Sequence, residues 1–249
     1  MKYIISILSI FFALNLTAQE SGRITYKAYF AKPEATEELR KRNIIRYQEK
    51  LDEEMMLSML TFNLDFKDSE SLFYLGNNAI SELEDQARKK YVTGLFYGYD
   101  KLYVDRDEDL LLEQLYYTFE TLLISRKASF PDWNLTSDTK TINGYKFYKA
   151  TYTYIQKWRG REFPWEIIAW YCPDIPLKFG PIRYSGLPGL ILELVEDDIG
   201  FIVDTINLNE KNVEIKRPSE GELITEKELN KKHLKEKEEL EKRINTDKE

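Results

Sequence analysis

The chain has 249 residues, of which 43% are hydrophobic and 14% aromatic, so it can build a core and is not a disordered chain. Its formal net charge of −7, without a basic stripe, argues against a nucleic-acid partner. Cys172 is the only cysteine, which excludes a disulfide within the chain.

The first eighteen residues have the pattern of a secretory signal peptide. Lys2 supplies a positive charge, residues 3–14 form an apolar stretch, and Ala18 offers a small residue for cleavage before a polar segment. A buried N-terminal helix or an uncleaved anchor are the alternatives. No stretch approaches the roughly 20 apolar residues of a membrane-spanning helix, so we expect no transmembrane segment after cleavage. The pattern predicts an exported protein, periplasmic or secreted.

The next two elements differ in their hydrophobic period. Residues 22–30 alternate aromatic and β-branched side chains, which is typical of a strand. Residues 36–60 carry apolar residues at helical spacing, with oppositely charged pairs four residues apart. The apolar residues are Ile44, Tyr47, Leu51, Met55 and Met59. We predict one long helix that lies with its apolar face across a sheet.

Strand patterns follow along most of the remaining chain. Residues 77–90 are polar and indicate a surface loop or a short helix, and Asn143-Gly144 indicates a tight turn. Residues 110–125 fit a strand or a helix, and their aromatic and threonine content favours a strand. The other predicted strands are residues 62–66, 71–75, 95–97, 101–105, 145–154, 166–171, 190–195 and 201–206.

The fold class that these patterns predict is mainly β (α+β). We expect a curved antiparallel sheet or half-barrel with the long N-terminal helix packed across it. The predicted organisation is a signal peptide over residues 1–18, one β-rich domain over 19–217 and a tail over 218–249. This tail is rich in Glu and Lys and contains His233, which indicates a charged helix or a disordered extension.

Most catalytic and metal-binding arrangements are excluded by missing residues. A Ser-His-Asp triad or a Cys-His pair is disfavoured because His233, the only histidine, lies in the charged C-terminal segment. A zinc site would lack its usual ligands, since the chain has one histidine and one cysteine. No glycine-rich phosphate loop is present. Residues 105–109 are acidic but lack the glycine of a calcium loop, so a hairpin turn is the favoured interpretation. We therefore predict no catalytic residue, metal ligand or cofactor site.

The segment between Trp170 and Leu194 has the most specific pattern. Its prolines exclude a continuous helix or central strand, and its glycines allow positive φ or close backbone approach. These residues are Pro173, Pro176, Pro181 and Pro188, with Gly180, Gly186 and Gly189. The pattern indicates a strand, a stiff loop and a second strand.

Residues 186–191 read Gly-Leu-Pro-Gly-Leu-Ile and resemble the signature of the GLPGLI family of exported Bacteroidota proteins. The resemblance extends through Trp170-Tyr171, Ile175-Pro176 and Gly180-Pro181. It continues weakly to Lys149-Ala150, ahead of which family members often carry a cysteine where this chain has Phe147. The resemblance implies export, but no established activity.

Two interpretations of the motif remain open. Its glycines and prolines could turn a corner of the sheet over packed leucines, or it could be an exposed apolar loop that docks on a partner or a ligand. On the second interpretation, the candidate binding residues are Gly186, Leu187, Pro188, Gly189, Leu190, Ile191, Trp170, Arg183 and Tyr184.

Two functions follow as hypotheses. The first is a non-enzymatic envelope module that binds an apolar small molecule, or an outer-membrane or periplasmic protein partner, on a concave aromatic surface. The aromatic candidates are Tyr145, Phe147, Tyr152, Tyr154, Trp158, Trp165 and Trp170. The second is a periplasmic hydrolase that uses a metal or carboxylates, with Arg183 or Tyr184.

Overall fold

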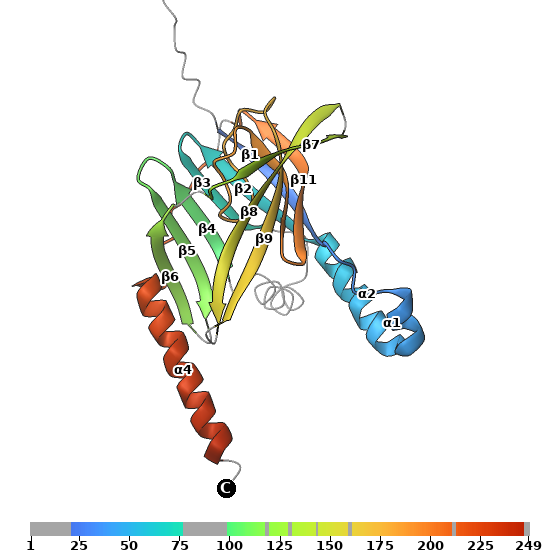
Figure 1. The fold of residues 1–249 in the computed structure, drawn as a ribbon. Coiled ribbons are helices and arrows are strands. Elements are labelled where there is room, and N and C mark those ends of the chain that lie inside the picture. Colours follow the sequence, from blue (N-terminus) through green and yellow to red (C-terminus); the bar gives the residue numbers. More distant parts are fainter. Residues whose placement is uncertain are drawn as a thin grey trace, which may run out of the picture.

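The computed structural model describes residues 21–76, 99–117, 120–128, 131–142, 144–158, 161–210 and 213–246. Within them one large β-sheet dominates, and helices stand at its margins (Figure 1). The mainly β prediction is confirmed. The predicted signal peptide and the predictions for residues 77–90 and 95–97 lie outside the described residues. Among the described helices, none has the length and apolar character needed to cross a membrane.

Twelve strands of the described chain form this sheet. Their bounds are β1 (Ser21–Phe30), β2 (Thr61–Lys67), β3 (Glu70–Leu75), β4 (Tyr99–Asp105), β5 (Leu110–Tyr117), β6 (Glu120–Lys127), β7 (Asn134–Ile142), β8 (Tyr145–Trp158), β9 (Arg161–Cys172), β10 (Leu190–Glu196), β11 (Ile199–Leu208) and β12 (Glu222–Thr225). The ambiguous stretch 110–125 is two strands, β5 and the first part of β6. The acidic residues after β4 form the predicted hairpin turn, since β4 and β5 pair antiparallel on either side of it.

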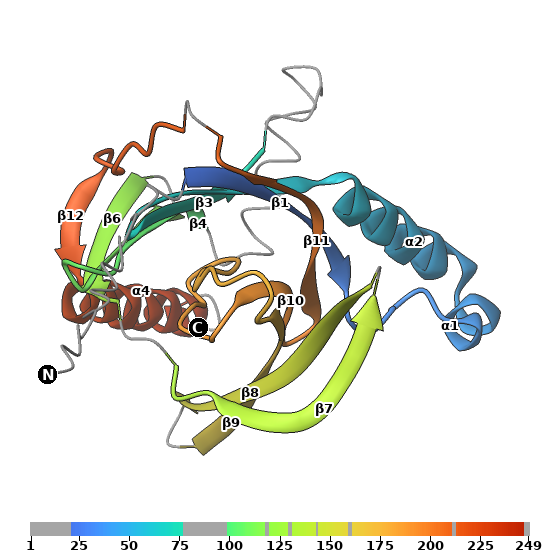
Figure 2. The same ribbon diagram turned by 90° about the horizontal axis from the view of Figure 1, so that it is seen from above.

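The strand order is β12-β6-β5-β4-β3-β2-β1-β11-β10-β9-β8-β7. Two meanders, β1 to β6 and β7 to β11, therefore join where β1 pairs antiparallel with β11. Among the described strands, every pairing is antiparallel except that of β12 with β6, which is parallel. Seen from above, the sheet curves strongly, so that the wing of β5 and β6 faces the wing of β8 and β9 (Figure 2).

The main core lies on the concave face of this sheet. Side chains from β1, β2 and β3, among them Ile24, Leu64 and Phe73, belong to the same buried cluster as the loop between β9 and β10. That loop, residues 173–189, lies inside the curve of the sheet in Figure 2. Part of the chain thus fills its own concave face, and this loop is the proline- and glycine-rich segment of the sequence.

The single long helix packed across the sheet is a wrong prediction. Two helices replace it, α1 (Glu37–Arg42) and α2 (Ile44–Met59). Asn43 interrupts them because its extended backbone ends α1, while its side chain accepts a hydrogen bond from the Arg46 N–H at the start of α2. Both helices stand beyond the sheet rather than across it (Figure 2).

The exposure of α2 gives the physical reason for this difference. Leu57 is its only buried residue, whereas Ile44, Met55 and Met59 are 58%, 59% and 57% exposed. The concave face, which an amphipathic helix would have covered, is already filled by residues 173–189. Periodicity predicted the helical conformation correctly but not the surface that its apolar side chains contact.

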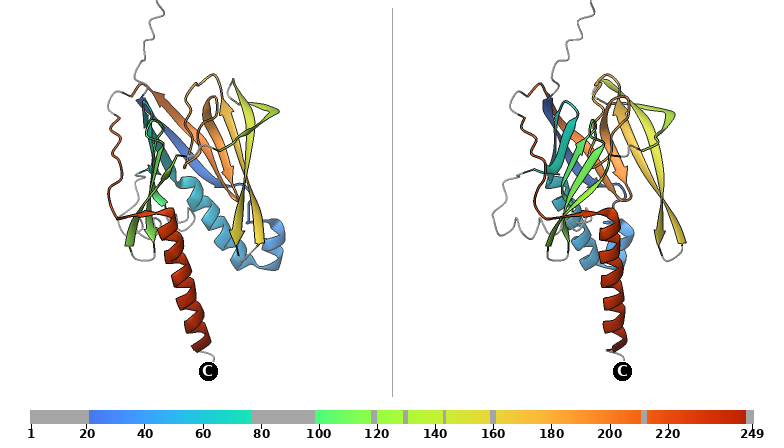
Figure 3. Two further views of the ribbon diagram at one scale, coloured as in Figure 1. Left: turned by 60° about the vertical axis from the view of Figure 1, so that its left-hand side comes forward. Right: turned by 90° about the vertical axis from the view of Figure 1, so that its left-hand side faces the viewer.

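The segment predicted as a charged tail begins as part of the sheet. Residues 213–221 pass along the outside of the molecule (Figure 3), where Ile215 packs on a small cluster that includes Tyr103. The chain then forms β12 beside β6 and continues as α4 (Glu226–Thr246). Leu229 of α4 is buried in a cluster with Leu122, so the start of this helix is anchored to the sheet.

Candidate functional site

The Gly-Leu-Pro-Gly-Leu-Ile motif leads from the loop into β10. Leu187 is 1% exposed, and Leu190 and Ile191 are fully buried, whereas Pro188 and Gly186 are exposed. The apolar side chains of the motif therefore lie in the core, and its surface consists of the proline ring and glycine backbone. This arrangement is the one expected of a motif that turns a corner of the sheet.

Two glycines of the motif have different physical roles. Gly186 has a φ of +88°, in the left-handed region that favours glycine. Gly189 lies against β9: a Cβ placed there would stand 2.2 Å from the carbonyl oxygen of Cys172. The next residue, Leu190, pairs with Cys172, so the absence of a side chain at Gly189 lets β10 join the sheet. Cys172 itself is buried.

Backbone and hydroxyl hydrogen bonds hold the loop to this corner. The N–H of Leu190 donates to the carbonyl of Ile175 at 2.9 Å, and the N–H of Ile191 donates to that of Phe179 at 3.0 Å. From β1, the buried hydroxyl of Tyr26 donates to the Ile191 carbonyl at 2.8 Å. The loop therefore has one defined path over the concave face.

Arg183 and Tyr184, both predicted site residues, lie in a network of charges on this face. Arg183 Nη1 is 3.3 Å from Glu113 Oε1 and its Nη2 is 3.6 Å from Glu196 Oε1. The Tyr184 hydroxyl donates to Glu196 at 2.7 Å. Arg126 Nε contacts Glu113 Oε2 at 2.6 Å. Glu113 of β5 is fully buried and Glu196 is 9% exposed, so the loop is tied to two different strands.

In this network the charges of the buried carboxylates are neutralised by arginine side chains. Burial, together with the neighbouring Glu196 carboxylate, raises the pKa of Tyr184, which keeps the phenol protonated as a hydrogen-bond donor. Each carboxylate has an arginine partner, which offsets the cost of burying its charge. Sequence reasoning did not find Glu113 or Glu196, because Glu113 is 70 positions from Arg183 and nothing local marks either glutamate.

Trp170 lies apart from these residues. Its ring is 4.3 Å from the ammonium group of Lys140, which also forms an ion pair with Glu193. Residues 161–171 of β9 pair with β8 without a break in register, so Trp170 and Trp165 point to opposite faces of the strand. The structure thus does not bring Trp170 together with Arg183 and Tyr184.

A chain of aromatic side chains continues from Tyr184 along the β8–β9 wing. Trp133 is 6.1 Å from Tyr184 and 6.2 Å from Tyr152, between ring centroids. Tyr152 stacks on Tyr154 at 6.4 Å, and Tyr154 stacks on Trp165 at 6.3 Å with an angle of 12° between the rings. Tyr152, Tyr154 and Trp165 are only partly buried, so this aromatic row is a half-covered surface.

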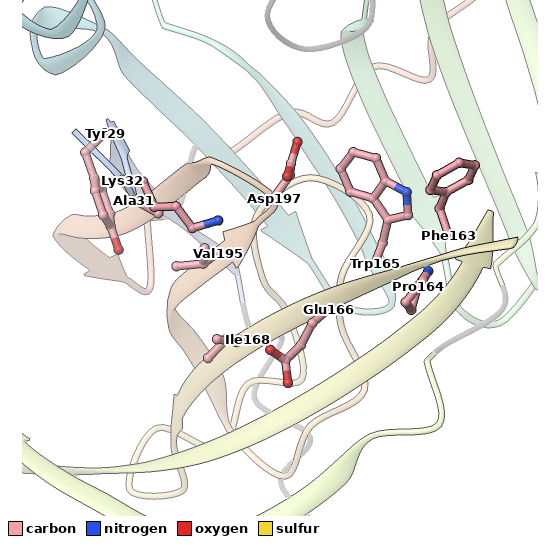
Figure 4. A pocket seen from close by; sticks show the side chains of 10 residues that line it. All are labelled: Tyr29, Ala31, Lys32, Phe163, Pro164, Trp165, Glu166, Ile168, Val195 and Asp197. Atoms are coloured by element: carbon pink, nitrogen blue, oxygen red, sulfur yellow. The ribbon is translucent and has the colours of Figure 1, made fainter. Parts of the chain in front are cut away.

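The row ends at a groove of about 900 Å³ at the end of the β10–β11 hairpin. The groove forms because β9 extends beyond β10: residues 167–172 of β9 pair with β10, whereas 161–166 do not. Figure 4 shows the lining side chains, which come from β9, from β10 with its turn, and from the end of β1. They are Tyr29, Ala31, Lys32, Phe163, Pro164, Trp165, Glu166, Ile168, Val195 and Asp197.

Most of the groove lining is apolar or aromatic, and three charged residues complete it. Lys32 forms an ion pair with Asp198, at 3.3 Å. Burial and the neighbouring Asp198 raise the pKa of Asp197 above its usual range. In the described part of the chain, no group of three or more His, Cys, Asp or Glu side chains is arranged to hold a metal ion. The sequence pointed to Trp165 only as one of many aromatic residues, and nothing in it marked Tyr29 or Asp197.

Comparisons with known proteins give one short match to a family model and no activity. A family model described as "Protein of unknown function (Porph_ging)" matches residues 156–193, from the end of β8 to the start of β10. No curated protein matches the chain.

Two solved structures of PNGF-II, in the C2 and P21 space groups, match the chain at 15% and 16% sequence identity. Their TM-scores are 0.43 and 0.44, and the matches cover 83% and 84% of this chain but 31% and 32% of those chains. The chain therefore spans about a third of their length.

Proposed function

We propose that this protein is a non-enzymatic binding module of the cell envelope that holds an apolar small molecule in the groove beside Trp165. The groove carries the proposal. Its volume of about 900 Å³ lies within the range of small-molecule sites, roughly 300–1,000 Å³. Its lining of aromatic and aliphatic side chains with few polar groups is also typical of such sites.

The aromatic row supports the same proposal. Trp165 lines the groove and stacks on Tyr154, so a ligand in the groove would extend a surface of packed rings. Partly exposed aromatic rings gain free energy when an apolar ligand removes them from water, about 25 cal/mol for each Å² covered. We therefore propose the neighbouring edge of the sheet as the binding site, in place of the motif loop, whose leucines are buried.

The envelope location rests on the sequence. Residues 1–18 have the pattern of a signal peptide, and residues 170–194 resemble the GLPGLI family of exported proteins. The match of residues 156–193 to a family of unknown function is consistent with membership of a family of this kind.

Two alternatives have some support. A hydrolase would use Glu113 and Glu196, which Arg183 brings to one place together with the Tyr184 hydroxyl. We favour binding because both carboxylates already pair with arginine side chains inside the fold, so neither is available to contact a substrate. An envelope protein partner could instead dock on the exposed apolar side chains of α2.

Native mass spectrometry tests the proposal. The protein is purified gently from its own cells, and its intact mass is compared with that of the Trp165→Ala and Trp170→Ala variants. We expect a reproducible excess mass that disappears on denaturation. It should be present in the wild type and in Trp170→Ala, which changes the opposite face of β9, and absent from Trp165→Ala. A wild-type mass equal to that of the chain alone would contradict a tightly held ligand.

A further inference from the structure

The arm formed by α1 and α2, which stands beyond the sheet, ends in two adjacent exposed isoleucines (Figures 1 and 2). Ile44 and Ile45, in the first turn of α2, are 58% and 72% exposed. Ile45 is the most exposed large apolar side chain in the described part of the chain. Isolated apolar side chains are common on protein surfaces, whereas contiguous ones with a polar rim mark interaction sites.

Basic side chains surround these isoleucines. Residues 40–46 carry four basic side chains and no acidic one, in a chain whose formal net charge is −7. All seven of these residues are exposed. Within the described residues, the side chains of Lys41 and Arg42 form no ion pair or hydrogen bond. The end of the arm is therefore an apolar patch with a basic rim, on a protein that is acidic as a whole.

The charge changes sign along the arm. Residues 49–54 of α2, nearer the sheet, carry four acidic side chains and one basic one. The other two basic side chains of the tip have acidic neighbours: Arg40 is 3.2 Å from Glu37, and Arg46 is 3.9 Å from Glu49. All four side chains are more than half exposed, so these ion pairs are weak and leave both guanidinium groups able to contact another anion. The arm therefore presents its positive end outwards.

A negatively charged lipid surface fits both features of this end. Interfacial membrane anchors combine apolar side chains that enter the headgroup region with Lys and Arg side chains that contact anionic lipids. The 16 residues of α2 span about 24 Å, whereas charges are screened over about 8 Å at physiological salt. The acidic body of the protein can therefore stay beyond the range of repulsion while the tip touches the surface.

We infer that residues 40–46, at the end of the arm, dock on an anionic lipid surface. Ile44 and Ile45 enter the headgroup region, and the four basic side chains contact lipid phosphates. This interaction surface shares no residue with the groove beside Trp165, so neither proposal depends on the other. The electrostatic part of the attraction should weaken as salt concentration rises.

Co-sedimentation with lipid vesicles tests the inference. The purified protein is mixed with vesicles of phosphatidylcholine alone, or of phosphatidylcholine with phosphatidylglycerol. We expect about tenfold tighter binding to the anionic vesicles, and a smaller preference as NaCl rises from about 0.1 M to about 1 M. The double variant Lys41→Gln/Arg42→Gln should lose most of this preference. A preference for anionic vesicles that survives in this variant would contradict the role of the basic rim.

A second double variant, Ile44→Gln/Ile45→Gln, tests the apolar patch and should weaken binding to anionic vesicles about tenfold. Glutamine favours a helix, so the arm should stay folded. Met55→Gln/Met59→Gln is the matched control, because it changes two side chains of similar exposure, 59% and 57%, on the same helix but nearer the sheet. It should leave binding unchanged.

Equal losses in the isoleucine and methionine variants, or no binding to either kind of vesicle, would overturn the inference. Sedimentation equilibrium without vesicles adds a further check. A dimer that Ile44→Gln/Ile45→Gln dissociates, with vesicle binding unaffected, would show that the tip contacts a second copy of the chain instead.

Discussion

At Gly189, the absence of a Cβ atom allows the loop to pass close to the backbone of β9. A Cβ at this residue would meet the carbonyl oxygen of Cys172 at 2.2 Å and the amide nitrogen of Pro173 at 2.8 Å. Both obstacles are backbone atoms, which cannot move aside without separating β10 from β9. The second glycine of the motif is therefore explained by packing.

Gly189→Ala should lower the free energy of unfolding by about 2–4 kcal/mol, as overpacking against a rigid neighbour does. Gly144→Ala is the comparison, since Gly144 has a φ of +84° but open space around its Cα. In Gly144→Ala, backbone strain should lower the free energy of unfolding by only about 1 kcal/mol. Urea unfolding of both variants measures this, and equal losses would show that close approach to Cys172 is unimportant.

Glu113 is a second residue whose role depends on distant partners. It is fully buried and contacts both Arg126 and Arg183. Glu113→Gln would leave two guanidinium groups without their shared carboxylate, so we expect a loss of about 2–4 kcal/mol in urea unfolding. Glu214→Gln, in an exposed pair with Lys216, should cost less than about 1 kcal/mol. A similar small effect at both positions would mean that the network does not hold the loop.

Asp197 allows a prediction about pH. Its pKa is raised in the folded protein, so its favourable contribution is complete below the pKa of the unfolded chain and is lost as pH rises through the folded pKa. Asp197→Asn should therefore be more stable than the wild type at pH 7, by up to about 0.5 kcal/mol for this exposed residue, and equally stable at pH 3. Thermal unfolding across this range measures the difference, and a variant less stable at pH 7 would contradict the assignment.

At the scale of elements, α2 shows that a local hydrophobic pattern can predict a helix without predicting its tertiary contacts. The spacing of its apolar residues predicted a helix, and Asn43 has the side chain of an N-cap, which could have indicated the break between α1 and α2. Nothing in the spacing shows that the concave face is already filled by residues 173–189. Which partner covers an apolar stripe is a property of the whole fold.

Substitutions in α2 test this arrangement. Leu57→Ala should cost about 2–5 kcal/mol, since Leu57 is fully buried. Met55→Gln should change stability by less than about 0.5 kcal/mol, because Met55 is 59% exposed and glutamine favours a helix as well as methionine does. Urea unfolding compares the two. A large loss in Met55→Gln would show that this face of α2 is covered.

The strands were more predictable than the helices, for a physical reason. Alternation of apolar and polar side chains is local, and it located most strands, including β1, β8 and β10. Register between distant strands is not local: β1 pairs with β11, and their Thr25 and Thr205 hydroxyls meet across 180 positions of sequence. The charge pairs of Arg183 and the lining of the groove depend on such pairings, so the sequence could not place them.

At the scale of the whole molecule, one curved sheet produces both the corner that holds the sequence motif and the groove beside Trp165. Its concave face holds the loop that contains the sequence motif, and the extension of β9 beyond β10 leaves the groove open beside the aromatic row. The motif and the proposed site are therefore neighbours with different roles: the motif builds the corner, and the edge next to it is available to a ligand.

Fluorescence quenching in single-tryptophan variants tests this account most directly. The chain has four tryptophans, so a variant that keeps only Trp165 can be compared with one that keeps only Trp170. Titration with 10-bromodecan-1-ol, whose bromine quenches on contact, should give saturable quenching of Trp165 and none of Trp170. Unsaturable or equal quenching of the two tryptophans would contradict an apolar site in the groove.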